Sequence, residues 1–399
     1  MNERLNERLI VWIWLQECLG YGRTGIQKIF SVFEKPEDIL TASEATLRET
    51  NLFNEHTLLK ILYKDLRYAK KVYDDCQRLG YDIISVLDER YPENLRKLDD
   101  LPLLLYVEGT LPKTGGILCT AVVGSRKATD ESKKIALDIG AGLAMNGAVV
   151  VSGGADGVDT QAHRGALSAN AQTVCVLGCG LNYNSLVKDV QLRKDISRSG
   201  AVISEYPPHV TSQKHTFLQR DRIIAGMCEC TVVVQAGIGS GSLATADLAM
   251  KYRRKVFVMK DTPDTPAFAG LKYLIRHGAD TIQTHTDLLR WYRKTEDMPA
   301  VEEAVSDQAQ QEKELHFEYR TRKRKSQPCT MEQTEKKFLS EQLTENAVMV
   351  YHTISEIPVD TDDISNAVDL DIPSVTAALT ELEMMGFVVQ IAGKRYIRK

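Results

Sequence analysis

The chain has few of the features that mark a membrane, secreted or metal-binding protein. Among its 399 residues, no apolar run approaches the roughly 20 residues that span a membrane. The N-terminal stretch "MNERLNERLIVWIWLQECLG" lacks a small-residue cleavage site, so we interpret it as a helix and not as a signal peptide. None of the eight cysteines forms a C-x-x-C pair, and the eight histidines do not cluster at ligand spacing. We therefore expect buried, reduced thiols in a cytoplasmic protein without metal or cofactor.

The chain also lacks an excess of positive charge. Its net charge is −4, which argues against a protein that coats nucleic acid through bulk electrostatics but is compatible with a local basic groove. Hydrophobic residues make up 43% of the chain and charged residues 26%, as in soluble globular proteins. At this length, two or three domains are expected.

Composition and periodicity divide the chain into four zones. We expect a helical domain over 1–78 and a domain of alternating strands and helices over 79–295. A polar, charged linker over 296–335 follows, and a compact helical unit with a terminal hairpin occupies 336–399.

Four apolar runs in the second zone each end in a glycine-rich turn. The turns are "GSR", "SGGADGVD", "GCG" and "AGIGSGS". Unbroken apolar strands that alternate with helices predict a parallel sheet covered by helices on both faces. The carboxyl ends of parallel strands share one edge, so the four turns should meet there and offer backbone N–H groups to an anion. The stretch "QAGIGSGSLATADLA" lacks the lysine of a G-x-x-x-x-G-K-[ST] loop, which leaves open whether the anion is a nucleotide or a nucleic-acid strand.

Charged residues beside these turns are candidates for the site. Arg126 directly follows the first turn and is suited to a bidentate phosphate contact. Asp159 is predicted to be the N-cap of the next helix, and His163 lies four residues later. No serine or cysteine nucleophile is placed to complete a triad, so we favour a structural role for Asp159 and leave that of His163 open. Thr245 is expected either to contact a phosphate or to cap its helix.

Two further arginines flank an aspartate in "FLQRDRIIAG". Arg220 and Arg222 are two residues apart and do not share a helix face. We expect one of them to point to the edge with the glycine turns, and the other to pair with Asp221 or a neighbour.

The order of these motifs resembles the DNA-processing protein A family, also called DprA or Smf. The resemblance rests on six segments in this order between residues 80 and 295: "VVGSR", "VSGGADGVDTQAH", "SEYPP", "FLQRDRIIAGM", "VVVQAGIGSGSLATADLA" and "GLKYLIRHGAD". It implies an α/β fold, an extended Rossmann-like parallel sheet with helices on both faces. It also implies flanking domains: an N-terminal helical domain of sterile-alpha-motif or helix-hairpin-helix type, and a C-terminal winged-helix domain.

The resemblance further implies a function. Family members are not known as enzymes; they bind single-stranded DNA, dimerise, and load the recombinase RecA onto incoming strands during natural transformation. The expected partners are therefore single-stranded DNA, RecA and a second copy of the chain, with no membrane. The phosphate-binding residues implied by position are Gly124, Ser125, Arg126, Ser152, Gly153, Gly154, Gly157, Arg220, Arg222, Gly239, Ser240, Gly241, Ser242 and Thr245.

The chain departs from the family pattern at several positions. The family usually has asparagine at position 221 and glutamate at position 235, where this chain has Asp221 and Gln235. An aspartate between two phosphate-binding arginines should weaken an anion site unless the arginines hold it. The loop over 180–196 departs as well, which leaves open whether Lys188, Arg193 or Lys194 faces DNA.

The flanking zones give weaker signals. The stretch "LGYGRTGIQKI" has the form of a helix-hairpin-helix turn, and a plain packing turn is an equal alternative. In the last zone, Pro373 near the start of the third helix fits a first-turn proline. That helix carries Glu381 and Glu383 and no basic residue, and 336–399 contains 10 acidic and 6 basic residues. We therefore favour a protein–protein role for this zone over reading of DNA bases.

A function of another class is the alternative. A nucleotide-binding or nucleotide-hydrolysing enzyme on the same Rossmann-like domain could use Asp159, His163 and Asp221 in acid–base roles. Tyr183, Tyr206 and Phe217 lie near the edge by their place in the motifs and are candidates either for base stacking or for the core.

Overall fold

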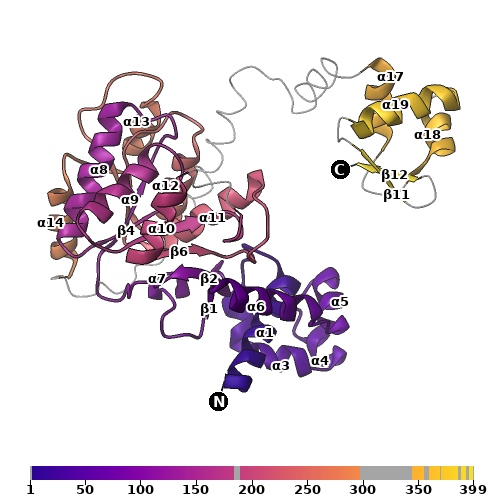
Figure 1. Cartoon of the computed structure of the whole chain (residues 1–399), viewed down its shortest axis with the longest axis horizontal. Coiled ribbons are helices and arrows are strands. Elements are labelled where there is room, and N and C mark those ends of the chain that lie inside the picture. Colours follow the sequence, from indigo (N-terminus) through magenta and orange to yellow (C-terminus); the bar gives the residue numbers. More distant parts are fainter. Residues whose placement is uncertain are drawn as a thin grey trace. The chain divides into compact units, whose positions relative to one another are not determined.

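The computed structural model describes residues 2–183, 189–296, 344–354, 359–368, 370–384, 388–391 and 395–398. The chain forms two compact units, residues 1–304 and 305–399, which are taken separately below (Figure 1). The predicted polar linker over 296–335 lies outside the described residues beyond its first position, and Lys188 lies outside them too.

The first unit begins with a set of short helices packed on a longer one, in indigo in Figure 1. These helices are α1 (Asn2–Leu19), α2 (Ile26–Val32), α3 (Pro36–Thr41), α4 (Glu44–Glu49), α5 (Glu55–Tyr63) and α6 (Arg67–Leu79). Ser43 and Asn54 begin α4 and α5 by accepting the backbone N–H of the third helical residue, which satisfies one of the donors left open at a helix start. Trp12, Ile13 and Leu15 of α1 are buried, and α1 packs against α3, α5 and α6.

A nine-stranded sheet forms the centre of this unit, in the order β1-β2-β6-β5-β4-β3-β7-β8-β9. Its strands are β1 (Asp82–Ser85), β2 (Leu104–Gly109), β3 (Cys119–Val123), β4 (Val149–Ser152), β5 (Thr173–Leu177), β6 (Ala201–Ser204), β7 (Cys230–Val233), β8 (Lys255–Met259) and β9 (Asp280–Ile282). The seven strands from β6 to β9 are parallel, and each of β3 to β7 is buried along its whole length, as the unbroken apolar runs predicted.

One edge of the sheet carries two antiparallel strands that were not identified from the sequence. β2 is antiparallel to β6, and β1 is antiparallel to β2. Between β1 and β2 the only helix is the four-residue α7 (Glu93–Arg96), which is too short for the helical crossover that a parallel pair requires. These two strands lie against α1 and α6, so they join the sheet to the N-terminal helices (Figure 1).

Helices cover both faces of the sheet, as predicted. The helices are α8 (Asp130–Met145), α9 (Val158–Ser168), α10 (Val190–Ser199), α11 (Lys214–Met227), α12 (Gly241–Lys251), α13 (Ala269–Arg276) and α14 (His285–Glu296). One group consists of α8, α9, α10 and α14, and the other of α7, α11, α12 and α13. Gly140 and Gly165 allow α8 and α9 to approach closely, since a Cβ at either position would lie 2.3 or 2.1 Å from a carbonyl oxygen of the other helix.

The second unit contains three helices and a small sheet. Its elements are α17 (Glu345–Thr353), β10 (Val359–Asp360), α18 (Thr361–Val368), α19 (Ile372–Met384), β11 (Val388–Ile391) and β12 (Arg395–Arg398). The strands are ordered β10-β12-β11, and Val350, Ile364, Leu379 and Leu382 lie in a separate core. This order of three helices and a terminal hairpin is that of a winged helix. Glu381 of α19 accepts hydrogen bonds from the backbone N–H and hydroxyl of Thr344, which ties the third helix to the first.

The cysteines behave as predicted where the structure describes them. Seven cysteines are buried and form no disulfide, and Cys329 lies outside the described residues. Within the described ranges, no cluster of three or more His, Cys, Asp and Glu side chains could hold a metal ion. Among the helices described, none is both long and apolar enough to cross a bilayer.

Candidate functional site

The four glycine turns lie at one edge of the sheet, as predicted. They follow β3, β4, β5 and β7, which are parallel, so all four turns leave the carboxyl ends of their strands. The chain moves outward from β3 through β4 and β5 to β6, then returns to the other side of β3 to form β7. This reversal is the topological switch point at which open parallel sheets bind ligands. The first and fourth turns flank it.

The first turn is locked to its neighbours by backbone contacts. The N–H of Ser125 donates to the carbonyl of Gln235 at 2.8 Å, and the N–H of Val158 donates to the carbonyl of Ser125 at 3.3 Å. Gly157 has φ of +93°, and a Cβ there would lie 2.3 Å from the Ser125 oxygen, so only glycine fits. The turn is therefore held in place before any ligand arrives.

The second turn is buried beneath this edge. The Ser152 hydroxyl donates to the Val122 carbonyl at 2.6 Å and is not exposed. Gly153 lies directly on the guanidinium of Arg220, since a Cβ would fall 1.7 Å from Nη1. Gly154 and Gly157 are also buried. The second turn thus supports the edge from within the fold and does not present an accessible loop to a ligand.

The prediction that Asp159 caps its helix is wrong. The N-cap of α9 is Gly157, and Asp159 is the second helical residue. Its carboxylate turns back toward the loop and accepts the N–H of Ala155 at 3.4 Å. Burial raises the pKa of Asp159, and the charge of Arg220 opposes the rise.

Arg220 and Asp221 form a buried pair just below the turns. Nε of Arg220 lies 3.1 Å from Oδ1 of Asp221, and Nη1 donates to the Val176 carbonyl at 2.9 Å. Burial raises the pKa of Asp221 to about 6; the charge of Arg220 opposes this rise and that of Asp159 adds to it. The charge of Arg126 and a hydrogen bond with Thr245 also lower the Asp221 pKa. Asp221, the aspartate that departs from the family pattern, is thus paired with Arg220, and the positive charge of Arg126 also acts on it.

Arg222 is not part of this set. Its side chain is buried, donates to the Asp100 carbonyl and pairs with the buried Glu205. Burial raises the pKa of Glu205, while the positive charge of Arg222 opposes that rise. The expectation of one arginine at the edge and one in a pair is therefore half met: Arg220 lies beneath the edge and Arg222 lies away from it.

The fourth turn is the most open of the four. Gly239 has φ of +77°, and a Cβ at either Gly239 or Gly241 would meet nothing within 4 Å. Ser240 is the N-cap of α12, but its hydroxyl lies 3.0 Å from that of Ser242 and makes no cap hydrogen bond. The positive end of the α12 dipole therefore faces an accessible glycine loop. Thr245 is buried one turn further in and is not accessible from this edge.

Gln235 has a structural role. Its Oε1 accepts the N–H of Thr129 at 2.9 Å, and Thr129 is the N-cap of α8. The side chain is 2% exposed. A glutamate could accept the same hydrogen bond, so this departure from the family pattern does not alter the exposed edge.

Arg126 and Phe217 form the charged and aromatic part of the edge. The Arg126 guanidinium is exposed and its Cζ lies 5.5 Å from the centre of the Phe217 ring. Lys214, the first residue of α11, and Lys127 are also exposed. Ile238 at the tip of the fourth turn is 65% exposed. We call Gly124, Ser125, Arg126, Phe217, Gly239, Ser240 and Gly241 the glycine-turn edge.

Lys214 and Ile238 are the residues that sequence reasoning missed. A single lysine at a helix start and an isoleucine between glycines carry no signal by themselves. The structure brings them to the edge because α11 begins at the carboxyl edge of the sheet and Ile238 lies in the turn between β7 and α12.

The third turn is covered by neighbouring backbone and is not part of the glycine-turn edge. A Cβ at Gly180 would lie 2.1 Å from the Pro207 oxygen, and Gly178 packs on the start of α11. In α10, which occupies much of the predicted 180–196 loop, Arg193 is buried against Glu108, whereas Lys194 is exposed. Of the basic residues considered there, Arg193 is therefore structural.

His163 does not reach the surface. It is fully buried, and its Nδ1 lies 2.8 Å from the Thr173 hydroxyl. Burial lowers the pKa of His163 to about 3, so the ring is neutral at physiological pH. An acid–base role for His163 at the edge is therefore excluded by its position.

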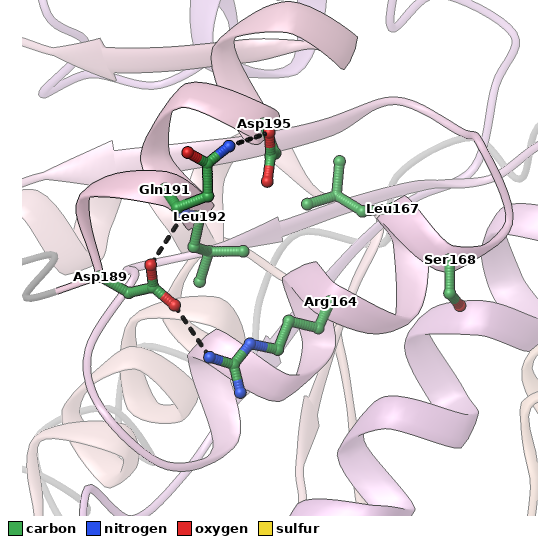
Figure 2. A pocket seen from close by; sticks show the side chains of 7 residues that line it. All are labelled: Arg164, Leu167, Ser168, Asp189, Gln191, Leu192 and Asp195. Atoms are coloured by element: carbon green, nitrogen blue, oxygen red, sulfur yellow. Dashed lines mark hydrogen bonds and ion pairs between the residues drawn. The ribbon is translucent and has the colours of Figure 1, made fainter.

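A separate surface pocket lies between α9 and α10. Its volume is about 340 Å³, and Figure 2 shows Arg164 reaching across it toward Asp189. The two groups are 2.9 Å apart, and Asp189 also caps α10 by accepting the N–H of Leu192. Arg164 and Asp189 are thus paired with each other, and Asp195, the other charged residue of the pocket, accepts a hydrogen bond from Gln191 at 2.8 Å. The pocket also lacks the glycine turns of the edge.

The turn "LGYGRTG" packs against the sheet domain. A Cβ at Gly22 would lie 3.4 Å from Gln219 and 3.5 Å from Arg222. Gln219 donates to the Tyr21 carbonyl at 3.2 Å, and the Tyr21 and Tyr206 rings are 4.8 Å apart. These contacts favour the packing-turn alternative over a phosphate contact at Gly22, and they place Tyr206 in the domain contact.

Comparison with known proteins gives a consistent result. The family model of DNA recombination-mediator protein A matches residues 82–293, and that of the DprA winged helix domain matches 334–394. The Smf protein of Synechocystis is 29% identical over 99% of this chain and 100% of its own length. The DNA processing protein DprA of Streptococcus pneumoniae is 36% identical over 51% of this chain and 72% of its own. The crystal structure of that protein covers 70% of this chain and 97% of its own, with a TM-score of 0.61 and 28% identity.

Proposed function

This chain belongs to the DNA recombination-mediator protein A family, and on that premise we propose that it binds single-stranded DNA along the glycine-turn edge. The DNA backbone lies over the first and fourth turns, where Arg126 and the start of α12 meet its phosphates. Phe217 offers a ring for a base to stack on. The observation that carries the proposal is the exposed Arg126 over the half-buried Phe217 ring, beside the first glycine turn and the open fourth turn at the switch point.

The role we propose is that of a mediator and not of an enzyme. The bound strand is protected and handed to the recombinase RecA, as in uptake and recombination of DNA in the cytoplasm. A homodimer would present two glycine-turn edges to one DNA strand. Once one edge has bound, the strand stays near the second edge, which raises the effective concentration of DNA there. Mixing the chain with RecA and DNA coated by a single-strand-binding protein tests this role, and faster RecA filament assembly is expected. Light scattering after size exclusion tests the dimer.

The residue-level proposal is narrower than the fourteen positions that the sequence suggested. Gly124, Ser125, Arg126, Gly239, Ser240 and Gly241 are assigned to contact phosphates. Seven of the remaining eight support the turns from within the fold: Ser152, Gly153, Gly154, Gly157, Arg220, Ser242 and Thr245. Arg222 is buried away from the edge in its pair with Glu205. For the domain boundaries we propose 78/79, 295/296 and 335/336, which limited proteolysis tests.

The binding experiment uses fluorescence anisotropy of a labelled oligo-dT at low and moderate salt, with excess ATP as competitor. We expect salt-sensitive binding that ATP does not displace, because phosphate contacts release counterions and the edge lacks the lysine of a nucleotide loop. Arg126→Ala should weaken binding at least about tenfold, by analogy with other charge-assisted phosphate contacts.

Arg198→Ala is the matched control. Its side chain is 74% exposed at the end of α10, which leads into the amino end of β6 and so lies at the opposite edge of the sheet. Equal binding by the two variants would refute the proposed site. Displacement of DNA by ATP together with consumption of the nucleotide would favour the enzyme alternative.

A further inference from the structure

A second surface with the chemistry of a single-stranded DNA site lies on the N-terminal helices. Tyr63 at the end of α5 is 73% exposed and Tyr68 at the start of α6 is 48% exposed. Large aromatic side chains are seldom left so open, because burying them stabilises a fold. Lys60 and Lys71 lie beside them, and both are exposed. We call Lys60, Tyr63, Tyr68 and Lys71 the α5–α6 platform.

The four residues lie at the end of one helix and the start of the next. Lys60 and Tyr63 are three residues apart on the exposed face of α5, and Tyr68 and Lys71 are likewise spaced on α6. Both helices pack against α1, which carries Glu17. Burial raises the Glu17 pKa, and a hydrogen bond from Tyr21 and the charge of Lys60 oppose the rise. The charge of Glu17 in turn adds to the rise that burial causes in the Tyr68 pKa.

The charge of this surface suits a polyanion. Over 60–71 there are five basic residues and one acidic residue, Asp65, which Arg67 holds at 2.8 Å. Across residues 2–183 and 189–296, neither Lys60 nor Lys71 forms an ion pair with a carboxylate. Exposed rings between unpaired lysines combine stacking with phosphate attraction, the combination with which proteins hold single strands regardless of sequence.

The platform adjoins the segment that leads to the glycine-turn edge. On α6, Asp75 shares a flank with Tyr68 and Lys71, and its Oδ2 lies 3.4 Å from Nε2 of His209. His209 belongs to the loop that runs into α11, and α11 carries Lys214 and Phe217 at its start. Two residues beyond Phe217, Gln219 contacts Tyr21 of the N-terminal region. The flank of α6 that carries Tyr68 and Lys71 therefore adjoins the loop that leads to Phe217, with Asp75 between them.

We propose that the α5–α6 platform is a second contact surface for the same strand of single-stranded DNA, in which Tyr63 and Tyr68 stack on bases and Lys60 and Lys71 attract phosphates. This inference rests on the proposed function of the glycine-turn edge, whose bound strand it extends. It makes binding depend on DNA length, because a short oligonucleotide fills the edge alone and a longer one reaches both surfaces.

The test compares the full chain with the double variant Tyr63→Ala/Tyr68→Ala on oligo-dT of about 8 and about 30 nucleotides, lengths chosen around the few-nucleotide footprint of one site. We expect the variant to bind the long oligonucleotide about fivefold or more weakly and the short one with unchanged affinity. Tyr63→Phe/Tyr68→Phe keeps the rings and should bind like the parent. In Lys60→Ala/Lys71→Ala, the affinity for the long oligonucleotide should depend less steeply on salt concentration, by the equivalent of about two phosphate contacts. The salt dependence for the short oligonucleotide should not change.

The outcomes separate the two proposals. If the parent binds both oligonucleotides and the alanine variants leave the long one unaffected, the platform is not a DNA surface and the glycine-turn edge stands. If the alanine variants weaken binding of both oligonucleotides equally, while circular dichroism and melting temperature are unchanged, the claim that only the long oligonucleotide reaches the platform is wrong. If the parent binds neither oligonucleotide, the proposed function itself fails.

Discussion

Replacing Asp221 with asparagine should favour the stability of the variant over that of the parent more at high pH than at low pH. Asp221 is 7% exposed, and burial raises its pKa from 3.8 to about 6 against the opposing charge of Arg220. The folded state therefore keeps the proton to higher pH than the unfolded chain does. Stability associated with this group is greatest in acid and is lost as the pH rises from about 3.8 through about 6.

The magnitude follows from the pKa. Each pH unit of difference between the folded and unfolded pKa is worth about 1.4 kcal/mol, so the ionised carboxylate costs the fold about 3 kcal/mol above neutral pH. Linkage places roughly 1.4 kcal/mol of this loss between about pH 5 and about pH 8. Asp221→Asn lacks this loss, so the difference in unfolding free energy between the variant and the parent should shift in favour of the variant by roughly 1.4 kcal/mol between these two pH values.

Urea denaturation followed by tryptophan fluorescence measures this difference across the pH range. Asp261→Asn is a suitable control, because Asp261 is exposed in a turn with φ of +58°, a conformation that asparagine accepts. The same variant should bind oligo-dT somewhat more tightly above about pH 6, because the negative charge near Arg126 is gone. Parallel stability profiles for the parent and Asp221→Asn would refute the reasoning, since the pH dependence would then come from other groups.

Two further predictions concern buried contacts. Arg222→Ala should lower the free energy of unfolding by about 3–5 kcal/mol in urea denaturation, because Glu205 is left buried without its partner; a loss below about 1 kcal/mol would contradict this. Gly153→Ala should cost about 1–3 kcal/mol because its methyl group would overlap Arg220, whereas Gly241→Ala, which meets nothing within 4 Å, should stay within about 1 kcal/mol of the parent in the same assay.

Much of the sheet domain could be predicted from the sequence because its signals are local. Unbroken apolar runs such as Cys119–Val123 and Val149–Ser152 predict buried parallel strands, and the glycines after them predict turns at a shared edge. The antiparallel β1 and β2 escaped this reasoning, because pairing depends on the length and path of the connection, not on the strand residues.

The candidate site likewise has features that could be predicted from the sequence and features that could not. The identity of Arg126 as an exposed residue beside a glycine turn was predictable from its position in the chain. The burial of Ser152, Arg220 and Arg222 was not, because a side chain at the edge and one just beneath it have the same sequence signature.

The sequence by itself determined the α/β architecture, the glycine turns at one sheet edge and the winged-helix order of the last elements, since each depends on local propensity and hydrophobic period. Only the tertiary structure decided which turns are open, that Asp221 is held by Arg220, and that α6 lies beside the loop leading to Phe217. These features join residues far apart in the chain. Exposure and pairing depend on which segments pack together, and no short stretch of sequence contains that information.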